Sequence, residues 1–137
     1  MENLLEYQTL SMFGTYSIAF ALRAIGSVLA IWLALRVANN IRMSNDSNVI
    51  SKLLGSAFGI LVMYGALYWQ MAYITIRANT ANGLKAMSEG GMQLTPGSEQ
   101  FLANFATDAV SLPIPVAIFD LVIIAMILLQ IWMPKKA

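Results

Sequence analysis

The chain has 137 residues, of which 58% are hydrophobic and 11% charged, and its formal net charge at pH 7 is +1. Soluble domains carry about 25% charged residues and nucleic-acid-binding proteins need clustered basic side chains, so neither class fits. The sequence contains neither cysteine nor histidine, which excludes disulfides, thiolate chemistry, histidine-ligated metals or haem, and Ser-His or Cys-His catalysis.

The first long apolar stretch covers residues 13–38. A helix needs about 20 residues to cross a hydrocarbon core of ~30 Å, so this stretch predicts a tilted transmembrane helix. The residues before it include Glu2 and Glu6 but no lysine or arginine, unlike the basic start of a signal peptide, so we expect the span to be retained. Those residues either extend the first helix or form a surface helix of their own.

Arg23 lies about midway along this first stretch. An arginine inside a membrane requires a solvated cavity or an acidic partner. Gly26 and Ala30 share its helical stripe, and small residues mark the faces on which membrane helices pack. We therefore expect Arg23 to face protein rather than lipid.

A polar loop at 39–50 leads to the second predicted span, 51–76, and favours a turn with a helix start near Ser51. Within this span Gly55 and Gly59 form a GxxxG pattern, which allows helices to approach closely. The same stripe continues through Ala66 to Gln70. We predict that it packs against another helix.

Residues 77–111 form a predicted loop between the second and third spans. Residues 83–99 of this loop are rich in glycine and are expected to be irregular. Residues 98–110 predict a short amphipathic surface helix, with Ser98 as a candidate cap. Its apolar stripe covers the mouth of the bundle or a partner subunit, or else rests on lipid. The stripe consists of Phe101, Leu102, Phe105 and Ala109.

The third predicted span covers residues 113–133 and contains one acidic residue, Asp120. Arg23, Gln70 and Asp120 thus provide one polar side chain per span at similar depth, and we predict an intramembrane salt bridge between Arg23 and Asp120. Three roles fit this polar centre. It holds the helices together, it lines a path for an ion, proton or polar ligand, or it satisfies a group on another subunit.

The distribution of basic residues predicts the orientation of the chain. Cytoplasmic loops carry an excess of lysine and arginine. One side of the predicted membrane has only Arg77 and Lys85, which predicts an outward amino terminus and a cytoplasmic carboxyl terminus. The other side carries Arg36, Arg42, Lys52, Lys135 and Lys136.

The sequence as a whole predicts an all-α integral membrane protein, multi-pass and single-domain over residues 1–137, with three transmembrane helices and a short amphipathic surface helix. We expect a non-catalytic accessory subunit of a larger complex in a bacterial-type inner membrane. Its expected partners are other membrane subunits and lipids, without nucleic acid, metal or cofactor. Its apolar faces suit lipid, pigment and quinone alike.

Two other functions remain open at this point. The chain can form a small homo-oligomeric channel or transporter in which Arg23 and Asp120 surround a shared pore. It can also be a lipid-modifying or quinone-reacting subunit that uses Arg23, Asp120 and nearby tyrosines. No nucleotide-binding loop, carboxylate pair or serine nucleophile motif accompanies these residues, so we do not expect an enzyme.

Overall fold

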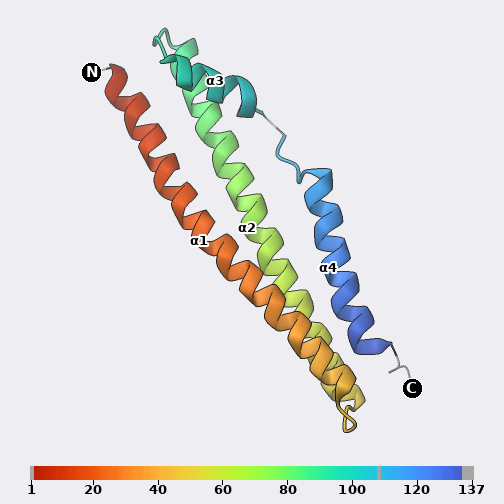
Figure 1. Ribbon diagram of the computed structural model, residues 1–137. Helices are drawn as coiled ribbons and strands as arrows, with labels where there is room; N and C mark the ends of the chain where they lie inside the picture. The colour runs from red at the N-terminus through yellow and green to blue at the C-terminus, as the bar shows by residue number, and fades with distance from the viewer. Residues whose placement is uncertain (1, 108, 134–137) are drawn as a thin grey trace. The chain divides into compact units, whose positions relative to one another are not determined.

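A computed structural model describes residues 2–107 and 109–133 of the chain. Lys135 and Lys136, which contribute to the orientation prediction, lie outside the described residues. The described part is helical, in the order α1 (Glu2–Met43), α2 (Val49–Glu89), α3 (Pro96–Phe105) and α4 (Ile114–Trp132) (Figure 1). Three of these helices, α1, α2 and α4, are long and apolar enough to cross a membrane. The predicted helical class and the predicted number of candidate spans are thereby confirmed.

Helices α1 and α2 extend well beyond the predicted spans. They contain 42 and 41 residues, which corresponds to about 60 Å each at helical rise. The residues before 13 therefore extend the first helix, one of the two alternatives that the sequence left open. Residues 83–89 are helical rather than irregular, and the leucine, lysine, alanine, methionine and glutamate of this segment are strong helix formers.

The glycine pair after α2 explains where this helix ends. The amide of Met92 donates to the carbonyl of Met87 at 3.1 Å, and the amide of Gly91 donates to the carbonyl of Ser88 at 3.0 Å. Together these bonds form a Schellman motif, which requires a left-handed residue after the helix. Gly91 fills that position with φ of 90°. The two glycines thus terminate the helix, whereas the prediction assigned the whole segment to a loop.

The start of α2 is fixed by a reciprocal cap. The amide of Ser51 donates to Asn48 Oδ1 at 2.8 Å, and the amide of Asn48 donates to Ser51 Oγ at 3.1 Å. These bonds satisfy two backbone donors that a helix start leaves open. The predicted turn and the nearby helix start are confirmed, with Val49 as the first helical residue.

Helix α3 lies in the segment where a helix was predicted, but its bounds are different. It begins at Pro96, after Thr95 as the N-cap residue, so Ser98 is not the cap. Proline is favoured at the first helical position because its fixed φ already suits a helix. The helix ends at Phe105, and Ala106 has extended backbone angles. The described residues after Ala106 that were predicted to be helical are not.

The chain divides into two compact units, which we describe separately. The α3 unit contains Met1–Leu22 and Gln70–Leu112, and the three-helix unit contains Arg23–Trp69 and Pro113–Ala137. Each long helix therefore contributes one part to each unit. In the three-helix unit, each described helical segment has about 20 residues and is about 30 Å long, which matches a hydrocarbon core.

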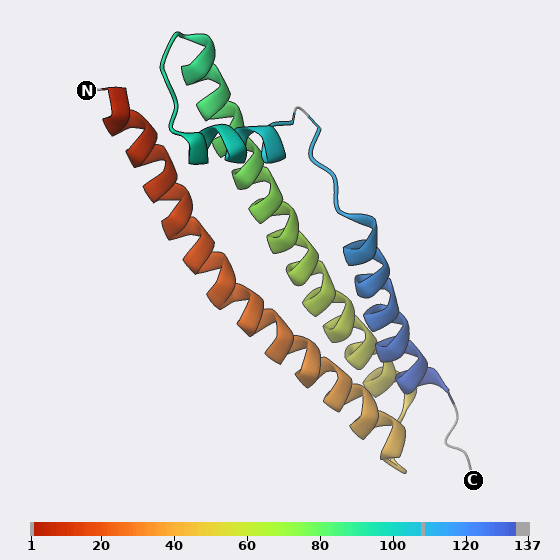
Figure 2. The ribbon, with the colours of Figure 1, turned by 45° about the horizontal axis from the view of Figure 1, so that its top comes forward.

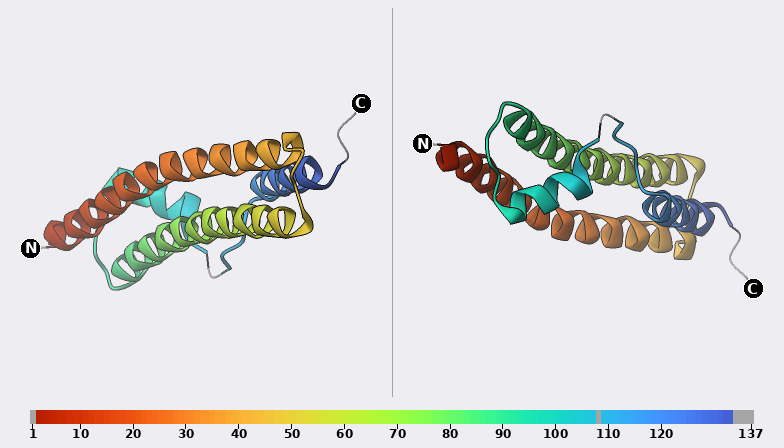
Figure 3. Two further views of the ribbon diagram at one scale, coloured as in Figure 1. Left: turned by 90° about the horizontal axis from the view of Figure 1, so that it is seen from below. Right: turned by 90° about the horizontal axis from the view of Figure 1, so that it is seen from above.

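The core of the three-helix unit lies among α1, α2 and α4. Figure 3 shows α4 beside the ends of α1 and α2 that the loop connects. The indole nitrogen of Trp132 donates to Ser56 Oγ at 3.0 Å and so joins α4 to α2. Small and branched apolar side chains fill the space between the helices. The buried members are Ala34, Ala38, Met63, Ile127 and Ile131.

The glycines of the GxxxG pattern contact this core directly. A Cβ atom added at Gly59 would lie 2.6 Å from Ile127 Cγ2, and one added at Gly55 would collide with Ile41 Cδ1. The absence of side chains at both positions lets α2 approach α4 and α1 closely.

The α3 unit is joined mainly by aromatic contacts. Figure 2 shows α3 lying across the C-terminal part of α2. The ring centroid of Phe101 lies 5.0 Å from that of Phe13 on α1 and 5.0 Å from that of Phe105. In addition, Asn82 Nδ2 donates to the carbonyl oxygen of Thr107 at 2.9 Å. α3 is therefore held to α1, and the residue two positions after its end is bonded to α2.

Candidate functional site

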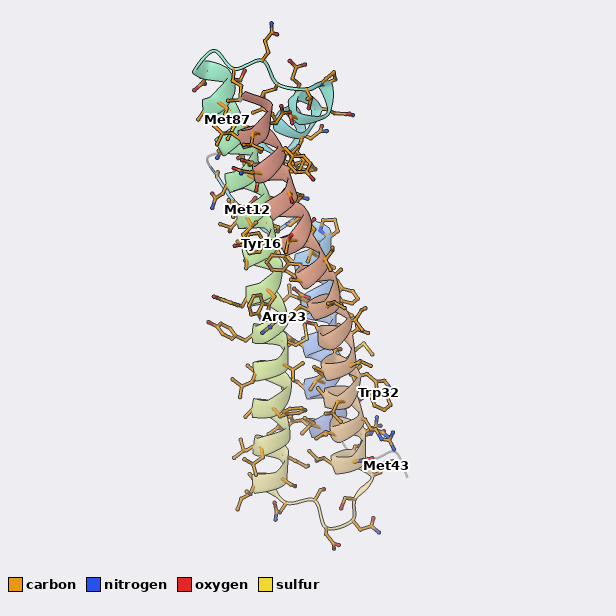
Figure 4. All side chains as sticks on the ribbon, turned by 90° about the vertical axis from the view of Figure 1, so that its left-hand side faces the viewer. Met12, Tyr16, Arg23, Trp32, Met43 and Met87 are labelled. Carbon is orange, nitrogen blue, oxygen red and sulfur yellow. The ribbon has the colours of Figure 1, made fainter. Side chains whose placement is uncertain are left out.

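Arg23 stacks on an aromatic ring of the neighbouring helix. Its Cζ atom lies 3.6 Å from the ring centroid of Trp69 on α2. Figure 4 shows Arg23 pointing from α1 towards α2, whereas Trp32 points away from this pair. Arg23 begins the α1 part of the three-helix unit and Trp69 ends the α2 part, so both lie at the same end of that unit.

The contact with Trp69 lowers the free energy of placing this charge in a membrane. Arg23 is exposed and lies at one end of the three-helix unit. A cation–π contact contributes about 0.5–1 kcal/mol at an exposed site and about 2 kcal/mol when it is desolvated. Trp69 therefore provides a favourable contact that the sequence prediction did not include.

The other two members of the predicted polar centre belong to different units. Asp120 is buried on α4 of the three-helix unit, with 6% of its surface exposed. Gln70 is half-buried and belongs to the α3 unit. Among described residues, the ion pair found within 4.0 Å joins Lys85 to Glu89. The pairing of Arg23 with Asp120 stays a prediction.

An open groove of about 400 Å³ runs along α1 and α2 below Arg23. Most of the side chains that line it are small or apolar, and Arg23 is the charged one among them. A Cβ atom added at Gly26 or Gly65 would meet no other atom within 4 Å, so the groove has free space at both positions. The lining residues are Arg23, Gly26, Ser27, Ala30, Leu61, Val62, Gly65, Ala66 and Trp69.

The small residues predicted to pack thus have two different environments. Gly55 and Gly59 contact isoleucine side chains of the chain itself. Gly26, Ala30 and Ala66 line the groove instead. The sequence pattern gives no sign of this difference, because a small residue allows close approach whether or not another side chain occupies the space.

A buried carboxylate in the α3 unit was missed by the sequence analysis. Glu6 has 2% of its surface exposed. Its Oε1 atom accepts hydrogen bonds from the amide of Thr95 at 3.0 Å and from Thr95 Oγ1 at 2.5 Å. The negative charge therefore lies at the N-terminus of α3, where the helix dipole favours it. An acidic residue between apolar neighbours on a helix was the available signal.

In the α3 unit, the basic residue Arg77 also contacts aromatic rings. Arg77 on α2 has its Cζ atom 4.3 Å from the ring centroid of Phe105 and 5.8 Å from that of Tyr73. It borders a cavity of about 190 Å³ together with Asn104 and Thr107. This contact connects α2 with the end of α3.

Within residues 2–107 and 109–133, histidine, cysteine, aspartate and glutamate form no group of three or more that could hold a metal ion. The arrangement of the polar residues supports charge recognition at Arg23 and structural anchoring at Glu6. Comparison with protein-family models, curated proteins and solved structures finds no match.

Proposed function

We propose that this protein is a non-catalytic accessory subunit of a larger membrane complex, in a bacterial-type inner membrane. The observation that supports this proposal is an exposed apolar surface on α1 before the predicted span. Leu4, Leu5 and Tyr7 have 56%, 52% and 70% of their surfaces exposed. They lie six to nine residues before residue 13, which places them about 9–14 Å outside the span at helical rise.

With a span that begins at residue 13, apolar side chains at that height lie beyond the hydrocarbon chains of the lipid. Exposed apolar patches outside a membrane mark surfaces where proteins associate. Glu6, between these residues, faces the N-terminus of α3 and is buried. One face of this part of α1 therefore contacts the chain itself, and the other is left for an unlike subunit.

The predicted orientation belongs to the same proposal. The amino terminus and α3 lie outside the membrane, and the loop between α1 and α2 lies in the cytoplasm. α3 acts as the surface helix of this arrangement, and its N-cap residue Thr95 contacts Glu6 on α1. The protein then positions or stabilises a partner that performs catalysis or transport.

Gentle detergent extraction followed by native mass measurement tests the proposal. We expect the chain to copurify with at least one unlike polypeptide in a fixed ratio. The Leu5→Asp variant is expected to release that polypeptide, because a charge in an apolar interface is strongly unfavourable. Ser88→Asp introduces the same charge at an exposed polar position of α2 in the same unit, serves as the control and is expected to retain it.

The other outcomes identify the other functions. A complex that contains only identical copies would favour the channel or transporter in which Arg23 and Asp120 surround a pore. A stable solitary chain would contradict both proposals. Equal retention of the partner by the Leu5→Asp and Ser88→Asp variants would show that this surface of α1 is not the interface.

A further inference from the structure

The groove between α1 and α2 has a cation at one end and an apolar floor. We propose that it binds an anionic glycerophospholipid, with the phosphate on Arg23 and the first part of one acyl chain along the small residues. This inference is independent of the accessory role proposed above, because it concerns a lipid rather than a protein partner.

The charge of the groove selects the ligand. Stacking on Trp69 occupies one face of the guanidinium group at 3.6 Å and leaves its N–H donors, which point outward in the plane, available for an acceptor. Guanidinium groups bind phosphate through two parallel hydrogen bonds. None of the residues that line the groove is acidic. A quinone or a neutral pigment would leave this cation without an anion.

The length of the groove favours a lipid over a protein helix. Its α1 wall extends from Arg23 to Ala30 and its α2 wall from Leu61 to Trp69. Each wall is about 10–12 Å long at helical rise, whereas a transmembrane helix would need a contact surface along ~30 Å. An acyl chain needs only a short apolar path that begins at its headgroup.

The position of Arg23 also suits a headgroup. Arg23 and Trp69 lie at the same end of the three-helix unit, and the groove continues from them towards the middle of that unit. Tryptophan is enriched where hydrocarbon meets headgroups. Arginine has a long apolar stem and can place its charge at that level from a position deeper in the membrane.

Native mass measurement of the purified protein, titrated with phosphatidylglycerol or phosphatidylcholine, tests the proposal. We expect one tightly bound phosphatidylglycerol and a weaker affinity for phosphatidylcholine, which has no net charge. Arg23→Gln is expected to weaken phosphatidylglycerol binding roughly tenfold or more. Arg36→Gln is the matched control, because Arg36 also lies near a tryptophan ring, at 5.3 Å, but does not line the groove.

A second variant fills the groove without changing its charge. Gly26→Leu places a side chain in open space, so the fold is expected to persist while phosphatidylglycerol affinity falls. Gly14→Leu, which also enters open space but lies outside the groove, is expected to bind normally. Equal losses in the Arg23→Gln and Arg36→Gln variants, unchanged binding in the Arg23→Gln or Gly26→Leu variant, or a polypeptide in place of lipid would each overturn the proposal.

Discussion

At the scale of single residues, the two glycines of the GxxxG pattern contact side-chain atoms that differ in how easily they can move. At Gly59 the nearest atom is Ile127 Cγ2, a methyl group attached directly to the branched Cβ of a residue with 1% exposure. At Gly55 it is Ile41 Cδ1, the far end of a longer side chain. Cδ1 of Ile41 can move away by rotation about χ2, whereas Cγ2 of Ile127 moves only with χ1, which is strongly restricted in a β-branched residue.

Gly59→Ala is therefore expected to destabilise the protein more than Gly55→Ala. Overpacking against Ile127 costs about 1–3 kcal/mol, whereas at Gly55 the gain of about 1 kcal/mol in helix propensity offsets the shift of one methyl group. Thermal unfolding in detergent, followed by circular dichroism, measures both. Gly14→Ala, which has no atom within 4 Å of its added Cβ, is the control. Equal destabilisation by the two α2 variants would contradict this packing.

At the scale of helices, the sequence predicted which long helices exist better than it predicted where each helix begins and ends. The three candidate spans follow from apolar length alone, which only a membrane or a large core can accommodate. Their ends depend on local hydrogen bonds, such as the glycine motif after α2 and the proline at the start of α3. The contact of Glu6 with Thr95 joins positions 89 residues apart, and no periodic pattern in the sequence reports such a contact.

The same contact leads to a prediction for α3. Glu6→Ala removes the acceptor of the Thr95 amide and hydroxyl, and we expect α3 amides to exchange hydrogen roughly tenfold faster as the helix opens locally. Hydrogen–deuterium exchange with mass spectrometry measures this rate. Glu89→Ala is the control, because Glu89 is exposed and its contact with Lys85 is a surface pair at 3.9 Å. Unchanged exchange in the Glu6→Ala variant would show that the aromatic contacts alone hold α3.

At the scale of the whole molecule, the division into two units is the feature that apolar length could not reveal. The apolar stretches of α1 and α2 are longer than one span. Hydropathy therefore locates each apolar stretch, but it does not locate the residue at which the helix changes the helix it packs against. In the three-helix unit the partner is α4, and in the other unit it is α3. The predicted polar centre crosses this division, since Arg23 and Asp120 belong to one unit and Gln70 to the other. Residue types and depth alone could not predict that grouping.

The orientation of the membrane spans provides the last prediction. The natural chain has no cysteine, so a single introduced cysteine reports its own location through a maleimide that does not cross membranes. Ser88→Cys, near the end of α2, is expected to react in intact cells. Ser44→Cys, in the loop before α2, is expected to react only after permeabilisation, because basic residues favour the cytoplasmic side. Both serines are exposed, so accessibility within the chain does not differ. The reverse pattern would invert the orientation, and labelling of both positions in intact cells would exclude a membrane crossing between them.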